Sequence, residues 1–162
     1  VTADHETGGI ALGTGKYALN LKALENQKAS AEVLSKKISD LRKAKNNHVA
    51  WEDIKNLLSE EMGFWSVLPI TWEQEKKLRD EYEKSFVRNK VEFAESMYAK
   101  TEPMAAKAKE VMDQIAMVGW TSGGHSAGYV PVFAIGAGSD LFIGKMDNTE
   151  IPKRIAKAGG YK

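Results

Sequence analysis

Between residues 17 and 118 the hydrophobic positions recur every three or four residues, which is the spacing of one face of an α-helix. The pattern predicts one helix over roughly 18–45, a second over 50–62, a third that begins after Thr71 and a fourth that begins at Pro103. The apolar positions that define these helices are Leu24, Leu34, Ile38, Leu41, Ile54, Leu58, Leu78, Tyr82, Phe86, Val111, Met112 and Ile115. We therefore expect at least four helices in this region, and more helix than strand in the whole chain.

Two helix boundaries are marked by their own residues. Thr71 is followed three positions later by Gln74, which is the spacing of a capping box, in which each side chain bonds the backbone N–H of the other. Gly63 directly follows the second helix, where a left-handed residue commonly ends the last turn.

The pattern changes after residue 118. The nearly unbroken apolar run from Val130 to Ile135 predicts a strand buried on both faces, and residues 141–143 predict another short strand. Residues 147–149 offer caps for a final helix over 150–158. Strand, helices, strand and helix in this order indicate an α/β layer protein with a helical insertion.

The first 16 residues are small, apolar and rich in glycine, and residues 1–3 read as the end of a strand. We expect the chain to be a fragment. Three zones follow: 1–16 is a strand end with a turn, 17–118 is the helical insertion, and 119–162 contains a loop, core strands and the last helix.

Composition excludes several classes of function and of binding site. The 162 residues are 43% hydrophobic and 28% charged, close to the average for globular proteins. The net charge of +1 argues against a nucleic-acid surface, which needs a clustered basic excess. No apolar run approaches the roughly 20 residues that cross a bilayer, so no membrane partner is expected. The absence of cysteine excludes disulfides and thiolate metal sites.

Candidate metal ligands lie near both ends of the chain. Asp4 and His5 pair a carboxylate with an imidazole, a combination that suits zinc, and the turn over 6–9 lets both side chains reach one ion. His125 lies among three glycines that allow the backbone to bend tightly and aim a single imidazole. His48 lies in a polar junction without another ligand at metal-binding spacing, and we interpret it as a solvated loop residue. Taken alone, an Asp-His pair is more often part of an ordinary loop, and the loop around His125 can equally be a plain connector.

Three blocks together resemble the alkaline phosphatases. Residues 1–9, Val-Thr-Ala-Asp-His-Glu-Thr-Gly-Gly, resemble the motif in which an Asp and the following His bind one zinc ion. Residues 120–128 followed by 130–136 resemble the later block whose His binds the other zinc ion, and 147–152 are similar to the segment that opens the last helix of the family. The blocks occur in the family's order. The chain departs from it at Ser126, where many members have Thr, and the hydroxyl is kept.

This resemblance implies a fold and a reaction. The fold is the C-terminal part of an alkaline-phosphatase-like α/β sandwich, with a large all-helical insertion between two short sheet segments. The reaction is hydrolysis of phosphate monoesters, releasing inorganic phosphate, by a two-zinc, phosphoserine mechanism with an accompanying Mg²⁺ ion. Asp4 and His5 would hold the zinc ion on the nucleophile, and His125 would help hold the one on the leaving group.

The resemblance also implies what lies elsewhere. The family's Asp-Ser-Ala nucleophile motif does not occur in the sequence, so we expect no catalytic residue here and no activity from this chain alone. The Mg²⁺ ligands and the remaining zinc ligands are likewise expected upstream. The complete protein would be bacterial, periplasmic or secreted, and a homodimer or otherwise self-associating. Two alternatives stay open: a segment of a sibling metal-dependent phosphodiesterase or sulfatase, or a non-catalytic helical interaction module.

Overall fold

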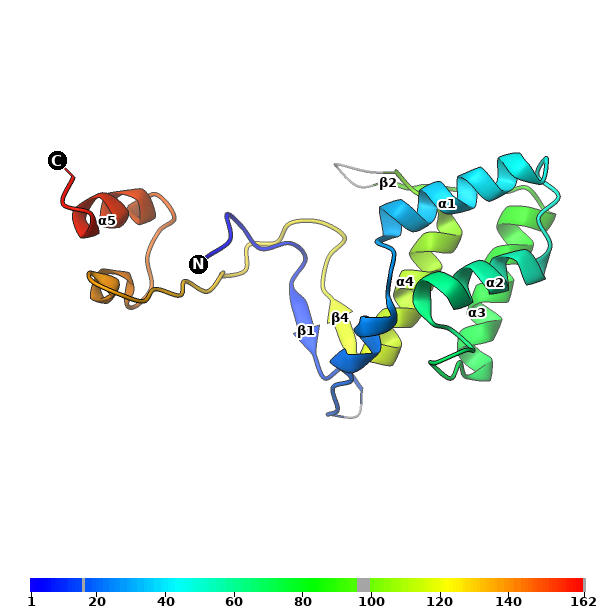
Figure 1. The fold of residues 1–162 in the computed structure, drawn as a ribbon, viewed down its shortest axis with the longest axis horizontal. Coiled ribbons are helices and arrows are strands. Elements are labelled where there is room, and N and C mark those ends of the chain that lie inside the picture. Colours follow the sequence, from blue (N-terminus) through cyan, green and yellow to red (C-terminus); the bar gives the residue numbers. More distant parts are fainter. Residues whose placement is uncertain (16, 96–99, 162) are drawn as a thin grey trace. The chain divides into compact units, whose positions relative to one another are not determined.

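The computed structural model describes residues 1–15, 17–95 and 100–161, which fall into two compact units (Figure 1). The helical unit is Ile10–Thr121, and the terminal unit combines Val1–Gly9 with Ser122–Lys162. The described residues are about half helical and contain two small antiparallel sheets, which agrees with an α/β fold in which helix exceeds strand. None of the helices in the part of the chain that the structure describes has the length and apolar character that a membrane crossing needs.

The helical unit contains the four α-helices that the periodicity predicts. They are α1 (Ala31–Ala44), α2 (Trp51–Met62), α3 (Trp72–Tyr82), which continues as the π-helical turn η2 (Glu83–Val87), and α4 (Pro103–Ala116). The capping box is confirmed, because Gln74 N–H donates to Thr71 Oγ1 at 3.3 Å and Thr71 N–H donates to Gln74 Oε1 at 3.0 Å. Gly63 ends α2 with a φ of 71°, and a Cβ there would lie 2.8 Å from Asn26 Cβ, so the position requires glycine.

The prediction of one continuous helix over 18–45 is wrong. The chain forms the 3₁₀ turn η1 (Leu21–Asn26), is extended at Gln27, and begins α1 only after Ser30. Ser30 is the reason for the new start, because its hydroxyl accepts the N–H of Val33 at 3.2 Å and caps the helix. The apolar spacing continues across this break, so periodicity alone does not reveal it.

The core of the helical unit forms around α4, which packs against α1, α2 and α3. Its fully buried side chains include Leu34, Ile38, Ile54, Leu58, Met62, Leu78, Met104, Val111 and Met112. A buried ion pair crosses the unit, where Arg42 Nη2 donates to Glu102 Oε1 at 2.9 Å. The other oxygen of Glu102 accepts the N–H groups of Met104 and Ala105 and so caps α4. Arg42 also stacks its guanidinium 3.5 Å from the ring centre of Phe86.

A short antiparallel pair closes the helical unit, and the sequence pattern did not predict it. Strand β1 (Ile10–Leu12) pairs with β4 (Val118–Trp120), with Ile10 opposite Trp120. Met117 makes β4 follow α4 directly, because its left-handed φ of 59° turns the chain out of the helix. A second pair joins β2 (Ala94–Glu95) to β3 (Lys100–Thr101).

The strands predicted for the terminal unit are not present. Residues 130–135 are extended but lie in no strand, and their backbone contact is with Val1, which exchanges bonds with Phe133 at 2.6 and 2.8 Å. Residues 1–3 likewise form no strand, and 141–143 give way to the 3₁₀ turn η3 (Ser139–Phe142). A strand buried on both faces needs neighbouring strands and covering layers, and the terminal unit supplies neither around 130–135, so Ile135 is fully exposed.

The final helix is confirmed as α5 (Glu150–Ala158). Asp147 organises its start, since Oδ1 accepts both the N–H of Thr149 at 2.9 Å and its hydroxyl at 2.7 Å. These bonds stabilise the charged carboxylate and hold the pKa of Asp147 below its ordinary value.

Candidate metal centre

The Asp4–His5 segment forms a bend in which both side chains are held by nearby backbone. Asp4 Oδ1 accepts the N–H of His5 at 3.0 Å, and His5 Nδ1 lies 2.8 Å from the carbonyl oxygen of Glu6. A carbonyl can only accept, so Nδ1 carries the proton in this contact and Nε2 of the neutral ring has the free lone pair. That Nε2 lies 3.5 Å from Asp4 Oδ2.

This spacing fits two ligands of one zinc ion. Ligand atoms bound tetrahedrally at 2.0–2.2 Å from zinc lie roughly 3.4 Å from each other. The separation of 3.5 Å between His5 Nε2 and Asp4 Oδ2 is close to that edge of the tetrahedron. Metal-binding histidines also usually donate their second ring nitrogen to a carbonyl or carboxylate, as His5 does to Glu6. The local geometry therefore suits a dication bound by both side chains.

The structure brings His125 to the same place. The ring centres of His5 and His125 are 3.7 Å apart and the two planes are tilted by 33°. The loop around His125 is fixed locally, since Ser122 donates its hydroxyl to the carbonyl of Gly124 at 2.7 Å and its N–H to the carbonyl of Gly8 at 3.2 Å. All three predicted ligands thus lie in the terminal unit and are exposed to solvent, whereas His48 lies in the helical unit between α1 and α2.

The three side chains do not form a complete set for one ion. Across residues 1–15, 17–95 and 100–161, no three imidazole or carboxylate groups converge closely enough to hold a metal. A catalytic zinc ion normally takes three protein ligands and keeps one position open. Each ion at this site would therefore need ligands in addition to those described here.

Glu6 organises the site, although the sequence indicates only its place in the turn over 6–9. Gly8 N–H lies 2.7 and 2.8 Å from its two carboxylate oxygens, and Gly9 N–H donates to it as well. From the other motif, Ser126 donates its N–H to Oε2 at 3.2 Å and its hydroxyl in a short bond. The Ser126 hydroxyl and the Gly8 amide lower the pKa of Glu6 to about 2, so the group is a carboxylate at neutral pH. A Glu before two glycines hints at the local part of this arrangement, but nothing in the sequence indicates the contact with Ser126.

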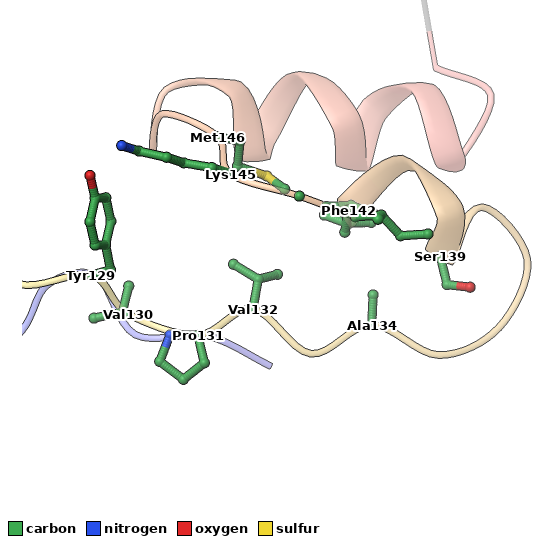
Figure 2. Close-up of a pocket in the computed structure, with 11 residues that line it drawn as sticks. Tyr129, Val130, Pro131, Val132, Ala134, Ser139, Phe142, Lys145 and Met146 are labelled. Atoms are coloured by element: carbon green, nitrogen blue, oxygen red, sulfur yellow. The ribbon is translucent and has the colours of Figure 1, made fainter.

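A cavity of about 570 Å³ lies elsewhere in the terminal unit, between the extended residues 129–134 and the segment from η3 to Met146 (Figure 2). Val132, Phe142 and Met146 give it apolar walls, and Lys145 Nζ lies 4.4 Å from the ring centre of Tyr129. Its lining contains no carboxylate and no imidazole. The cavity is therefore separate from the candidate metal ligands and offers packing surface instead.

The known proteins to which this chain is similar are alkaline phosphatases. The chain is 30% identical to alkaline phosphatase 3 of Bacillus subtilis (strain 168) over 99% of its own length, and 26% identical to alkaline phosphatase 4 of the same organism over 96%. The crystal structure of a cold-active alkaline phosphatase from a psychrophilic Shewanella species superposes with a TM-score of 0.61, at 24% identity, over 97% of this chain. That likeness supports the fold.

The chain is much shorter than these relatives. It spans 29% and 28% of the two Bacillus proteins and 32% of the Shewanella chain. Alkaline phosphatases generally use metal ions, which agrees with the donor set described above. The alkaline phosphatase family model matches residues 1–161, nearly the whole sequence, and the chain therefore belongs to the alkaline phosphatase family.

Proposed function

We propose that this chain is the C-terminal segment of a zinc-dependent enzyme that hydrolyses phosphate monoesters. The observation that carries the proposal is the 3.7 Å approach of the His5 and His125 rings. These residues belong to two sequence blocks that resemble separate zinc-binding motifs, and the fold places them side by side. A pair of zinc ions a few ångströms apart requires such an arrangement of ligands.

The roles proposed for the three side chains are those that the family resemblance implies, and their contacts are compatible with these roles. Asp4 Oδ2 and His5 Nε2 face each other at 3.5 Å and would share the ion that acts on the nucleophile, while His125 would help hold the ion on the leaving group. The bound ions would supply charge stabilisation for the attacking and leaving oxygens. The carbonyl of Glu6 keeps the proton of His5 on Nδ1, so that Nε2 stays available for metal.

The remaining machinery would lie outside these 162 residues. The sequence has no Asp-Ser-Ala, and Ser126, which precedes Ala127, donates its hydroxyl to Glu6. A phosphoserine mechanism therefore needs a serine from another part of the protein, as do the Mg²⁺ site and the missing zinc ligands. In the complete enzyme, residues 130–135 would gain the strand neighbours of an α/β sandwich, and residues 17–118 would be a helical insertion in it. The chain on its own would be inactive.

The proposal extends to partners and location. A phosphate monoester is the substrate, inorganic phosphate is a product, and the complete enzyme is a homodimer in the periplasm or outside the cell. The exposed apolar residues of the terminal unit, such as Phe133 and Ile135, support association of some kind. Fractionation of cells that produce the complete protein tests its location.

Zinc titration of the chain by calorimetry tests the proposal. Wild-type chain should bind zinc weakly, because each ion lacks at least one ligand, and His5→Ala and His125→Ala should each reduce that binding further. His48→Ala is the matched control, because His48 lies in the helical unit, and it should leave zinc binding unchanged. No hydrolysis of a chromogenic phosphate ester should exceed background for any of these samples.

Two results would overturn the proposal. A sub-micromolar zinc site in the wild-type chain would mean that the ligands here are sufficient by themselves. Equal zinc binding by wild type, His5→Ala and His125→Ala would mean that these rings are not ligands.

A further inference from the structure

One carboxylate joins the two motif blocks of the terminal unit. Glu6 follows the Asp4–His5 pair directly, and Ser126 follows His125 directly. Ser126 gives Glu6 Oε2 both its N–H, at 3.2 Å, and its hydroxyl, across a sequence separation of 120 residues. The residue that follows His5 is therefore hydrogen-bonded to the residue that follows His125.

The Glu6 carboxylate has no capacity left for a metal ion. Oε1 accepts from Gly8 and Gly9, and Oε2 accepts from Gly8 and twice from Ser126. The single N–H of Gly8 is shared between the two oxygens, so four donors in all face the carboxylate, which offers about four lone-pair sites. Although Glu6 is the carboxylate next to His5, its bonding suits a structural anion. Hydrogen bonds to an ionised acceptor are roughly twice as strong as bonds between neutral groups.

The surroundings of this contact are closely packed. A Cβ at Gly128 would lie 3.0 Å from Glu6 Cγ and 3.3 Å from Ser126 Oγ, so a larger residue there would require one of these side chains to shift by a few tenths of an ångström. Gly8, which donates to the other side of the carboxylate, is buried. Glycines on both sides thus allow the backbone to approach one glutamate.

We propose that Glu6 is a positioning residue that holds the Asp4–His5 turn against the His125 loop, so that His5 and His125 are adjacent before any metal binds. We call this contact the Glu6–Ser126 bridge. The inference deepens the proposed function and rests on it for the identity of the ligand, but the bridge itself is a property of the metal-free chain. Without it, the two blocks would have to be brought together by the metal ions, and part of the binding free energy would be lost in ordering them.

The chemistry of the bridge predicts which substitutions it tolerates. Ser126→Thr keeps the hydroxyl and should keep the bridge, whereas Ser126→Ala removes the hydroxyl donor. Glu6→Gln keeps one oxygen for the glycine amides but places an NH₂ group, itself a donor, opposite the donors of Ser126. Glu32→Gln is the matched control, because Glu32 is an exposed carboxylate on α1 in the helical unit.

Histidine NMR on the full, metal-free chain tests the bridge directly. The sequence has only three histidines, so labelled imidazoles give three assignable sets of signals, and His48 serves as an internal reference. At 3.7 Å between ring centres, His5 and His125 should show a ring-to-ring nuclear Overhauser effect. We expect this effect in wild type, Ser126→Thr and Glu32→Gln, and its loss or strong reduction in Ser126→Ala and Glu6→Gln. The His48 signals should stay unchanged in every variant.

The same samples separate this inference from the proposed function. Three outcomes would each overturn the bridge: full retention of the nuclear Overhauser effect in Glu6→Gln or Ser126→Ala, its loss in Ser126→Thr, or its absence from wild type.

A zinc titration of the same samples tests the metal role. Zinc chloride added to wild type should shift the His5 and His125 signals, and Ser126→Ala and Glu6→Gln should need about 10- to 100-fold more zinc for the same shift. If zinc shifts neither ring while the variants still lose the effect, the bridge stands and the proposed metal role fails.

Discussion

The helical and terminal units differ in what holds them together and in what they carry. Among the described residues, every buried apolar side chain belongs to the helical unit, from Ala23 to Val118. Asp4, His5 and His125 belong to the terminal unit and are exposed. This chain therefore places its apolar packing in the helical unit and its candidate metal ligands in the terminal unit, so the stability of the first says little about the integrity of the second.

The interactions follow the same division. Burial of large apolar side chains stabilises α1 to α4, at about 1.5–3 kcal/mol for each fully buried one. The terminal unit contains hydrogen bonds instead, among them the Glu6–Ser126 bridge, the exchange between Val1 and Phe133, and the bonds from Thr149 to Asp147 before α5. A typical intramolecular hydrogen bond contributes only about 0.5–1.5 kcal/mol net. The two units should therefore respond very differently to substitution.

The largest effect should come from the buried ion pair of the helical unit. Glu102→Ala leaves the Arg42 cation without its buried partner and removes the cap of α4, which should lower the free energy of unfolding by about 3–5 kcal/mol. Urea unfolding followed by far-UV circular dichroism measures it. Glu110→Ala is the control, because Glu110 pairs with Lys77 at 3.1 Å on the surface and should cost less than about 1 kcal/mol. Equal losses of unfolding free energy in Glu102→Ala and Glu110→Ala would mean that the buried ion pair does not contribute more to the stability of this unit than a surface pair.

Core truncation should distinguish the units next. Leu58→Ala, at a fully buried position of α2, should destabilise the helical unit by about 2–5 kcal/mol, because a cavity remains. Ile155→Ala on α5, where the side chain is 55% exposed, should change the same unfolding transition by no more than about 0.5 kcal/mol. Similar losses for both variants would contradict the difference between a unit with a buried apolar core and a unit without one.

Self-association should depend on the terminal unit. The extended residues 130–135 expose Phe133 and Ile135, and apolar extended segments pair readily with other chains. Replacing both with serine should abolish a concentration-dependent rise in mass in light scattering. Val67→Ser in the helical unit, where Val67 is also exposed, should leave that rise unchanged. A wild-type chain that stays monomeric at high concentration would contradict the prediction.

The smallest effect concerns pH and the helical unit. Arg79 and the indole N–H of Trp65, at 3.1 Å, bond the Glu75 carboxylate and hold its pKa below the ordinary value of 4.5. A lowered folded-state pKa stabilises the fold above pH 4.5, and this contribution is lost as the pH falls through the lower value. Because Glu75 is partly exposed, wild type should lose at most about 1 kcal/mol more than Glu75→Gln on acidification. The free energy of unfolding of wild type and of Glu75→Gln, measured at about pH 6 and about pH 3, tests this prediction. An equal loss of stability in both proteins on acidification would contradict it.

Local patterns made the helices predictable. The spacing of Leu78 and Tyr82 and the pair Thr71 and Gln74 are complete within one segment, so α3 and its start could be read from the sequence. The break before α1 was missed because Ser30 competes as a cap inside an unbroken apolar spacing. Asp4, His5 and His125 could be named as candidate ligands because their motifs resemble those of the family. Their role in binding zinc stays a prediction.

Features that depend on distant partners could not be predicted in the same way. The apolar run from Val130 to Ile135 has the composition of a buried strand, but a strand exists only where neighbouring strands supply hydrogen bonds. Among the described residues, the hydrogen bonds of this run are made with Val1 and Thr2. The bridge between Glu6 and Ser126 is a contact across 120 positions, and neither residue differs from an ordinary loop residue by type.

The pairing of β1 with β4 has a consequence for the order of folding. Bringing Glu6 to Ser126 in an unfolded chain would mean closing a loop of 120 residues, at an entropic cost that grows with the logarithm of its length. Once the helical unit has folded, Ile10 and Trp120 are held opposite each other, and only a few residues on either side remain to be closed. Replacing a loop of that length by one of about ten residues lowers the closure cost by roughly 2 kcal/mol. The helical unit would in this way act as a folding template for the metal-binding motifs, although it supplies none of their ligands.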